Sequence, residues 1–124
     1  MNKVVLIGIV CTDPELRYTR ADAPVLNFRL VTREQWRTAD GTKDGREDFH
    51  GVSYFGSSAE SLSKILSKRC IVAIDGRLQY DKVEKDGLTS IKAAIIASRV
   101  DIIKFAGDRE DFDFNSAEPA FGNR

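Results

Sequence analysis

The sequence predicts an all-β domain in which one helix is inserted between the third and fourth of five strands. Stretches that alternate apolar and polar residues, or that concentrate β-branched residues, recur along the chain and indicate strands. The period changes to that of a helix once, near residue 60. With 124 residues, of which 42% are hydrophobic and 31% charged, the chain has the composition of one globular domain.

The first three predicted strands are separated by a proline and by polar turns. Pro14 follows the first strand, because proline cannot donate to a strand ladder. Farther on, alternation places Leu26, Phe28 and Leu30 on one inner face. The segments expected in this half are a buried strand over residues 3–10, a half-buried strand from residue 25, a polar loop over 38–45 and a third strand over 46–56.

A helix and two further strands are expected next. Ser57 and Glu60 fit a capping box, in which the serine caps the first helical turn and the glutamate reaches back to it. Apolar residues at helical spacing follow. The remaining segments are a fourth strand over 70–83 with a bulge at Gly76, a hairpin turn over 85–87 and a fifth strand over 88–105.

Charge divides the chain into a domain over residues 1–107 and a tail over residues 108–124. The first part carries 17 Lys and Arg against 14 Asp and Glu, whereas the tail carries two against five. The tail also loses the apolar periodicity, so we expect it to be disordered and acidic. A mildly basic body with an acidic tail is typical of a polyanion-binding domain, and equally of a domain with a solubilising end.

Five strands with a helix between the third and fourth is the arrangement of the OB-fold. Curling such a sheet into a partly open barrel removes most of its exposed edges. OB-folds bind oligonucleotides or oligosaccharides on the face of their second and third strands. The function therefore depends on which residues occupy that face.

Two phenylalanines on the third strand predict a stacking surface. Phe49 and Phe55 share one face, and Gly51 and Ser53, which are small, lie between them in the same phase. Exposed rings beside cations suit an unpaired nucleic acid, because bases stack on the rings while phosphates meet Lys and Arg. Ordinary burial of both rings is the alternative.

Trp36 and three arginines add to this surface. Arg29, Arg33 and Arg37 recur every four residues and form a basic stripe, for which a plain solvated face is the alternative. Trp36 shares the phase of the inner residues of its strand. It is either a core tryptophan or lies where the strand has passed the rim of the barrel, and the polar loop that follows favours the rim.

No pattern of catalytic or metal-binding residues is found, so neither an enzyme nor a cofactor is expected. Glu47 and Asp48 are adjacent carboxylates, but neighbours in a strand point to opposite faces. With one histidine and two distant cysteines, no zinc site can be proposed. The longest apolar run is far shorter than the ~20 residues that cross a bilayer. The cysteine usage fits a reducing, cytoplasmic location.

Several short motifs occur together over about residues 2–105. They are Asn2-Lys3-Val4-Val5-Leu6-Ile7-Gly8, Asp13-Pro14-Glu15-Leu16-Arg17-Tyr18, Asn27-Phe28-Arg29-Leu30, Trp36, Phe49-His50, Phe55-Gly56, Ala59-Glu60 and Ile74-Asp75-Gly76-Arg77-Leu78. Their combination closely resembles the bacterial-type single-stranded DNA-binding proteins. The resemblance implies a homo-oligomer, usually a tetramer, that wraps single-stranded DNA in the nucleoid during replication, recombination and repair.

The resemblance also implies roles for individual residues. His50 matches a position at a subunit interface, and Glu118, Pro119 and Phe121 loosely resemble a tail end that docks onto replication and repair proteins. The positions that match Trp36, Phe49 and Phe55 stack bases, and those that match Lys3, Arg37, Lys68 and Lys82 lie near the DNA backbone.

The sequence departs from the family at the stacking positions. Val83 stands where a tryptophan is common, Phe49 where the usual residue is tryptophan, and Gly51 where a basic residue is common. We expect a sequence-tolerant single-stranded DNA-binding protein without enzymatic activity. The alternative is a divergent OB-fold interaction module with weak affinity for DNA.

Overall fold

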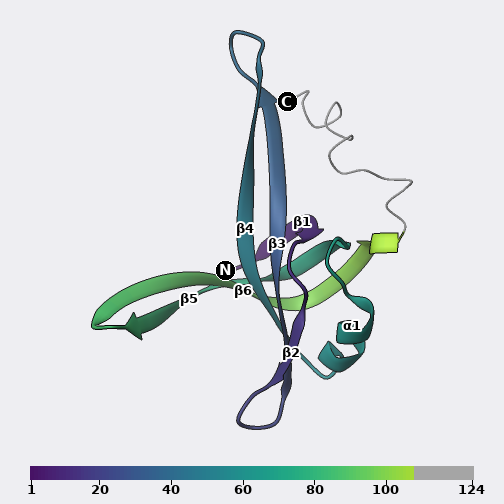
Figure 1. Cartoon of the computed structure of the whole chain (residues 1–124), viewed down its shortest axis with the longest axis vertical. Coiled ribbons are helices and arrows are strands. Elements are labelled where there is room, and N and C mark those ends of the chain that lie inside the picture. Colours follow the sequence, from purple (N-terminus) through teal and green to yellow (C-terminus); the bar gives the residue numbers. More distant parts are fainter. Residues whose placement is uncertain (108–124) are drawn as a thin grey trace.

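Five strands wrap into a closed barrel from which two hairpins project in different directions (Figure 1). The computed structural model describes residues 1–107. Its elements are β1 (Val4–Val10), β2 (Glu15–Tyr18), β3 (Pro24–Arg37), β4 (Lys43–Phe55), α1 (Ala59–Ile65), β5 (Ile71–Lys85) and β6 (Leu88–Lys104). The predicted OB-fold is confirmed, with α1 joining the third and fourth strands of the barrel. Within residues 1–107, no helix has the length and apolar character that a membrane crossing needs.

One pair of neighbouring strands in the barrel is parallel. The strand order is β1-β5-β6-β4-β3-β2, and a further pairing of β1 with β3 closes the ring, so that β2 lies outside it. A ring with an odd number of strands cannot alternate direction throughout, so at least one neighbouring pair must be parallel. The parallel pair joins Val52–Tyr54 of β4 to Ile95–Ala97 of β6.

Two glycines allow strands to approach at points where a side chain would not fit. A Cβ atom on Gly76 would lie 2.4 Å from the carbonyl oxygen of Ile96, and one on Gly8 would lie 2.3 Å from that of Val31. The register between β5 and β6 shifts between Asp75 and Gly76, which confirms the bulge expected at Gly76. Both contacts join strands that close the barrel.

Apolar side chains from the inner faces of the strands fill the barrel. Leu26, Phe28 and Leu30 of β3 are buried, as their alternation predicts. The first strand differs from the prediction of a buried strand, because alternate residues of β1 face outward. Val5 is 64% and Ile7 is 58% exposed. A run of aliphatic residues does not show by itself whether one or both faces of a strand are covered.

Two local predictions were wrong. The short strand β2 was not expected, because Pro14 marked a break and only four residues pair with β3. The capping box was also not found, since Ser58 precedes α1 and makes no side-chain cap hydrogen bond. Its hydroxyl oxygen lies instead 2.6 Å from that of Tyr54.

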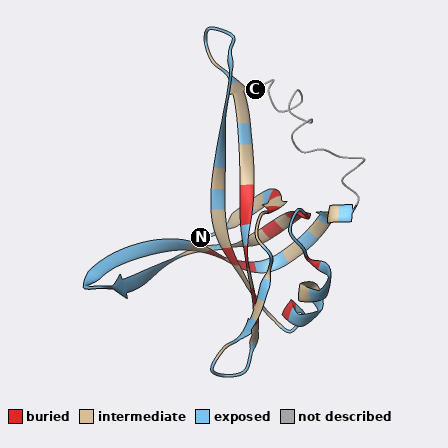
Figure 2. Cartoon of the chain, in the orientation of Figure 1, coloured by how far each residue is buried: buried red, intermediate tan, exposed pale blue. Residues whose placement is uncertain are grey.

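The two projecting hairpins contain no buried residue; the β5–β6 arm is almost wholly exposed, whereas β3 in the other arm is largely half-buried (Figure 2). We define the β3–β4 arm as residues 32–37 with 43–48, and the β5–β6 arm as residues 79–85 with 88–94. β4 begins at Lys43, so the polar loop is shorter than predicted. The turn of the β5–β6 arm is confirmed, with positive φ angles of 55° at Asp86 and 76° at Gly87.

We predict that Gly76→Ala lowers the free energy of unfolding by about 1–3 kcal/mol, measured by urea denaturation. The added methyl group would overlap a backbone oxygen of β6, which cannot rotate away. Gly51→Ala is the control, because a Cβ at that position meets no atom within 4 Å. Equal stability of the two variants would contradict the role given to Gly76.

Candidate nucleic-acid interface

The outer face of β3 and β4 carries two exposed phenylalanines, one in the middle of β4 and one at its end. Phe49 is 56% and Phe55 is 48% exposed, so neither ring is sealed in the barrel. Val52 and Tyr54, in the opposite phase, pack inward as predicted. Gly51 lies between the rings with open space above it. The structure therefore leaves both predicted rings accessible to a ligand.

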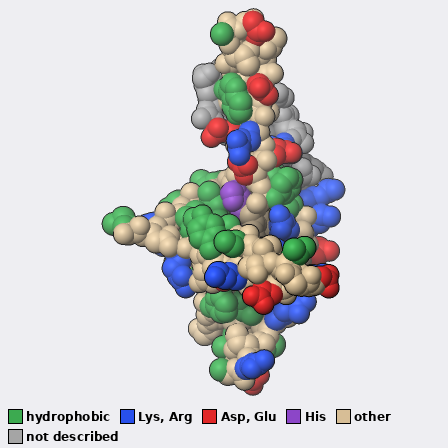
Figure 3. Space-filling model, turned by 90° about the vertical axis from the view of Figure 1, so that its left-hand side faces the viewer, with side chains coloured by type: hydrophobic (Ala, Val, Ile, Leu, Met, Phe, Trp, Pro, Cys, Tyr) green, Lys and Arg blue, Asp and Glu red, His purple; other side chains and the backbone are tan. Residues whose placement is uncertain are grey.

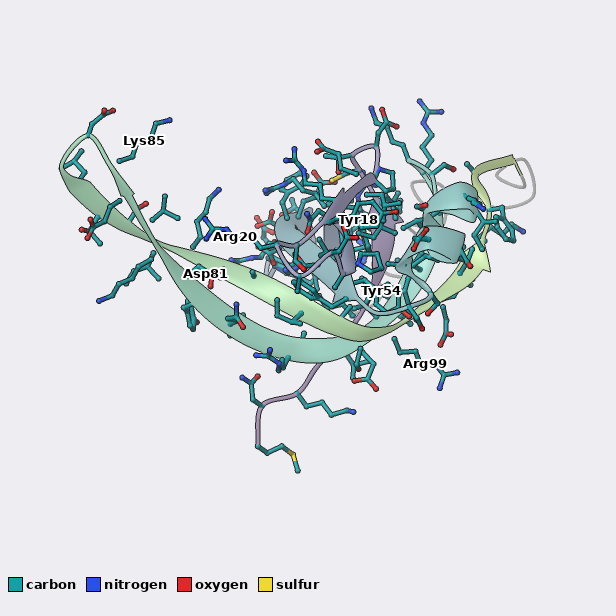
Figure 4. All side chains as sticks on the ribbon, turned by 90° about the horizontal axis from the view of Figure 1, so that it is seen from below. Tyr18, Arg20, Tyr54, Asp81, Lys85 and Arg99 are labelled. Atoms are coloured by element: carbon teal, nitrogen blue, oxygen red, sulfur yellow. The ribbon has the colours of Figure 1, made fainter. Side chains whose placement is uncertain are left out.

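A groove of about 570 Å³, which we call the Phe49 groove, opens in front of the first ring. Its floor is the outer face of β3 and β4, and its walls are the segment from the end of β1 through β2 and the β5–β6 arm. Figure 4 shows Asp81 on that arm and Lys85 close to its tip. The residues on which the argument depends are Asp13, Glu15, Arg17, Arg29, Phe49, Asp81, Val83 and Lys92.

Hydrogen bonds hold one wall of the Phe49 groove against its floor. The backbone N–H of Arg29 donates to the hydroxyl of Thr12 at 2.9 Å, and its carbonyl oxygen accepts from the N–H of Cys11 at 2.9 Å. On the floor, the hydroxyl of Ser53 donates to the side-chain oxygen of Asn27 at 2.6 Å. These contacts fix the backbone on both sides of the Arg29 side chain.

The Phe49 groove is balanced in charge rather than basic. Arg17, Arg29 and Lys92 line it together with Asp13, Glu15 and Asp81. Arg17 forms an ion pair with Glu15 at 2.7 Å, and Lys92 is the direct strand partner of Asp81.

Sequence reasoning missed Arg17 and Lys92. The sequence did contain a signal for Arg17, because the apolar Leu16 stands between the charged Glu15 and Arg17, as in a strand with one covered face. In the structure Leu16 packs on the core, and Glu15 and Arg17 are exposed.

We call a second hollow, of about 440 Å³, the Phe55 hollow. Its lining residues come from the start of the chain, from the end of β4, from β5 and from β6. Lys3 and Phe55, which were predicted separately, both line it, and Arg77 joins them. Lys3 forms an ion pair with Asp75 at 3.0 Å. The side chain of Asn2 donates to the carbonyl oxygen of Leu78 at 2.7 Å and accepts from its N–H at 2.9 Å, which secures the start of the chain.

The arginine stripe divides among different environments. Arg29 lines the Phe49 groove, whereas the half-buried Arg33 pairs with Glu47 at 2.6 Å. Arg37 donates to the carbonyl oxygen of Gly41 at the turn of the β3–β4 arm. Trp36 is half-buried and lies on that arm, opposite Asp44. The interpretation that Trp36 lies past the rim of the barrel is confirmed.

The other predicted residues lie apart from the two hollows or at their edge. Lys68 is exposed between α1 and β5, and Lys82 is exposed on the β5–β6 arm. His50 is half-buried, with its Nε2 atom 2.9 Å from the hydroxyl of Thr32. Figure 3 shows hydrophobic side chains gathered over the barrel on one side of the molecule, with Lys and Arg around them. The tail residues Glu118, Pro119 and Phe121 lie outside the described residues.

Comparison by sequence leads to one family. The model of the Single-strand binding protein family matches residues 1–103. The single-stranded DNA-binding protein of Neisseria meningitidis is 33% identical over 112 residues, which are 90% of this chain and 63% of that protein. The protein of the same name from Aquifex aeolicus is 33% identical over 103 residues, 83% of this chain and 70% of that protein. The chain thus spans slightly less than two thirds of the Neisseria relative.

Comparison by structure gives the same fold. A deletion mutant of the single-stranded DNA binding protein from Thermus aquaticus matches with a TM-score of 0.75 at 28% identity, over 87% of this chain and 53% of that chain. The Plasmodium falciparum SSB complex with ssDNA matches with a TM-score of 0.78 at 24% identity, over 84% of this chain and 96% of that chain. At 24% identity, the match to the Plasmodium falciparum structure shows a shared fold.

Proposed function

The chain belongs to the single-strand binding protein family, and from this premise we propose that it binds single-stranded DNA with little regard to sequence and without catalysis. The observation that carries the proposal is the exposure of Phe49 and Phe55. Both lie on the outer face of β4, while the inner face of the same strand packs into the barrel. Leaving two rings in water forgoes the stabilisation that burial would give. Such rings are available to a ligand. The role would be protection of unpaired strands during replication, recombination and repair.

Stacking on aromatic rings explains the tolerance of sequence. Every base has a flat π face, so a ring accepts any base, and each stack contributes roughly 1–3 kcal/mol, a magnitude established on this same family. Phe55 lies six residues after Phe49, which corresponds to about 20 Å at 3.3 Å per residue. A DNA strand that reaches both rings therefore has several nucleotides between them. Trp36 on the β3–β4 arm would hold a further base.

Cations in both hollows would meet the phosphates. Arg29 lies beside Phe49 in the groove, with Arg17 and Lys92 in its walls. Lys3 and Arg77 line the hollow of Phe55. Of the remaining predicted contacts, Arg33, Arg37, Lys68 and Lys82 would meet DNA that passes along the arms and around the barrel.

We propose further that the chain forms a homo-oligomer, for which the family resemblance suggests a tetramer. β1 pairs with β5 over Val4–Ile9 but with β3 only at Ile9 and Val10, which leaves an edge of its first half without a strand partner in residues 1–107. Val5 and Ile7 are exposed on the same strand. A second copy would cover an open edge and an apolar face together. His50 remains the predicted interface histidine.

The acidic tail remains a proposed partner-binding segment. Its residues Glu118, Pro119 and Phe121 resemble the docking end of the family, and replication or repair proteins in the cytoplasm would be the partners.

We predict that Phe49→Ala weakens binding to a dT oligonucleotide by about 5- to 150-fold, because one stack is lost. Fluorescence anisotropy of a labelled oligonucleotide measures the affinity. Phe55→Ala should have an effect of the same order. Phe105→Ala is the control, since Phe105 is 45% exposed but lines neither the Phe49 groove nor the Phe55 hollow. Unchanged affinity in both Phe49→Ala and Phe55→Ala would refute the stacking proposal.

We predict that Glu15→Gln and Asp81→Asn each raise the affinity for oligo(dT) at low salt, by up to about fivefold, because the first releases Arg17 from its ion pair and the second removes a carboxylate opposite Lys92. Asp101→Asn is the matched control: it also removes an acid from an ion pair, with Arg99 at 2.9 Å, but outside the groove. An equal rise in all three variants would reflect net charge alone. That result would contradict the proposal that the DNA passes through the Phe49 groove.

We predict that Ile7→Lys lowers the molar mass of the oligomer in light scattering, because a charge would replace an apolar side chain at the proposed contact between copies. Ile65→Lys is the control, since Ile65 is 53% exposed on α1. The same mass for the original chain and for Ile7→Lys would place the interface elsewhere.

A further inference from the structure

A polar pair of side chains lies on the floor of the Phe49 groove, between the two phenylalanines of β4. Asn27 of β3 and Ser53 of β4 are direct strand partners, and both line the groove. Ser53 follows Phe49 by four residues and precedes Phe55 by two, on the same face of the strand. A DNA strand that reaches both rings therefore passes over this pair.

The hydrogen bond from Ser53 determines what the amide of Asn27 offers to a ligand. The hydroxyl of Ser53 donates to Oδ1 of Asn27 at 2.6 Å, whereas Nδ2 makes no hydrogen bond within residues 1–107. In that part of the chain, the one buried side-chain polar atom without a partner is Oε1 of Gln35, so Nδ2 of Asn27 is accessible. An amide nitrogen carries two N–H donors. Asn27 therefore presents unused donors in the Phe49 groove.

The charged neighbours of Asn27 leave this excess of donors in place. Glu15 of β2 is its other strand partner, but the guanidinium of Arg17 donates to Oε2 of Glu15 at 2.7 and 3.1 Å. Arg29 lies two residues from Asn27 on the same face and lines the groove as well. Its guanidinium carries donors and no acceptor. The floor between the two rings thus favours a ligand edge that accepts hydrogen bonds.

Gly51 leaves room for a base beside the pair. It lies between Phe49 and Ser53 on the outer face, and a Cβ at that position would meet no atom within 4 Å. A base whose sugar and phosphate lie toward the cations of the walls directs its far edge to the floor. That edge carries a keto oxygen in thymine and guanine, and an amino group in cytosine and adenine.

We infer that Asn27, oriented by Ser53, makes the Phe49 groove prefer the keto bases thymine and guanine over the amino bases cytosine and adenine. The inference rests on the proposed function and adds a specificity-determining pair to its binding surface. Nδ2 donates to a keto oxygen, whereas an amino group would place a donor against a donor. One such hydrogen bond changes the affinity by about 2- to 10-fold, which leaves binding tolerant of sequence.

The test is the ratio of the affinities of the full chain for oligo(dU) and oligo(dC), measured by fluorescence anisotropy. Both bases lack the methyl group of thymine, and they differ in the keto or amino group at the far edge. The preference for oligo(dU) should fall by about 2- to 10-fold in Asn27→Ala. It should fall at least as far in Asn27→Asp, which keeps the shape but replaces the donors by an acceptor. Ser53→Ala should also lower it, because the amide is then free to turn.

The matched control is Gln35→Ala. Gln35 carries the other side-chain amide of β3, on the same face of the strand but outside the Phe49 groove. Its removal should leave the ratio as in the original protein. Oligo(dI) and oligo(dA), which differ in the same way among purines, should repeat the pattern. The stacking of each oligonucleotide on itself is the same for every variant and cancels when the ratios are compared.

A purely structural role for the pair gives a different result. If Asn27 and Ser53 only join β3 to β4, their variants weaken binding to oligo(dU) and oligo(dC) equally, and the unchanged ratio overturns the inference. An equal fall of the ratio in Gln35→Ala would overturn it too. Asn27→Asp keeps the inference testable if the alanine variants do not fold.

The failures of this inference and of the proposed function are distinguishable. If the original protein binds oligo(dU), Phe49→Ala weakens that binding and the ratio is the same in every variant, the inference about Asn27 is wrong alone. If the original protein binds none of the oligonucleotides, the proposed function fails as well.

Discussion

Closing a ring of five strands forces β4 and β6 to run parallel, and the rest of the structure depends on the contact at residues 95–97 of β6. This segment pairs with β4 on one side and meets Gly76 of β5 on the other, where there is room for backbone only. The contact fixes the register of β4, with Val52 inside the barrel. Because successive strand residues point to opposite faces, Phe49 and Phe55 must then point outward. A slip of one residue would bury both rings.

The same closure explains the two arms. β6 pairs with β4 over three residues only, whereas β5 and β6 pair along almost their whole length. The strand residues beyond the ring have no third strand to cover them, so they project as hairpins (Figure 1). Trp36 on one arm and Tyr80 on the other are therefore exposed or half-exposed because their strands are longer than the barrel. The surface offered to a ligand extends beyond the barrel for this reason.

The fold could be predicted because its main determinants are local in sequence. Alternation in β3 and β4 places Leu26 inside and Phe49 outside, and the Asp86-Gly87 turn fixes a hairpin. What could not be predicted depends on partners distant in sequence. Ser58 makes its hydroxyl contact with Tyr54 of β4, and Lys3 meets the hollow of Phe55 only once the barrel is closed. The place of Arg17 in the wall of the Phe49 groove depends on the pairing of β2 with β3, which the sequence did not predict.

The balance of charge in the Phe49 groove determines which interaction can supply the affinity. Exposed ion pairs contribute about 0.2–1 kcal/mol each, and salt screens them beyond about 8 Å at physiological ionic strength. A groove in which three acids offset three bases gains little net attraction for phosphate at long range. Stacking on Phe49, Phe55 and Trp36 would contribute roughly 3–9 kcal/mol before the cost of ordering the DNA. Affinity in this molecule should therefore follow the number of exposed rings, while the cations orient the phosphates between them.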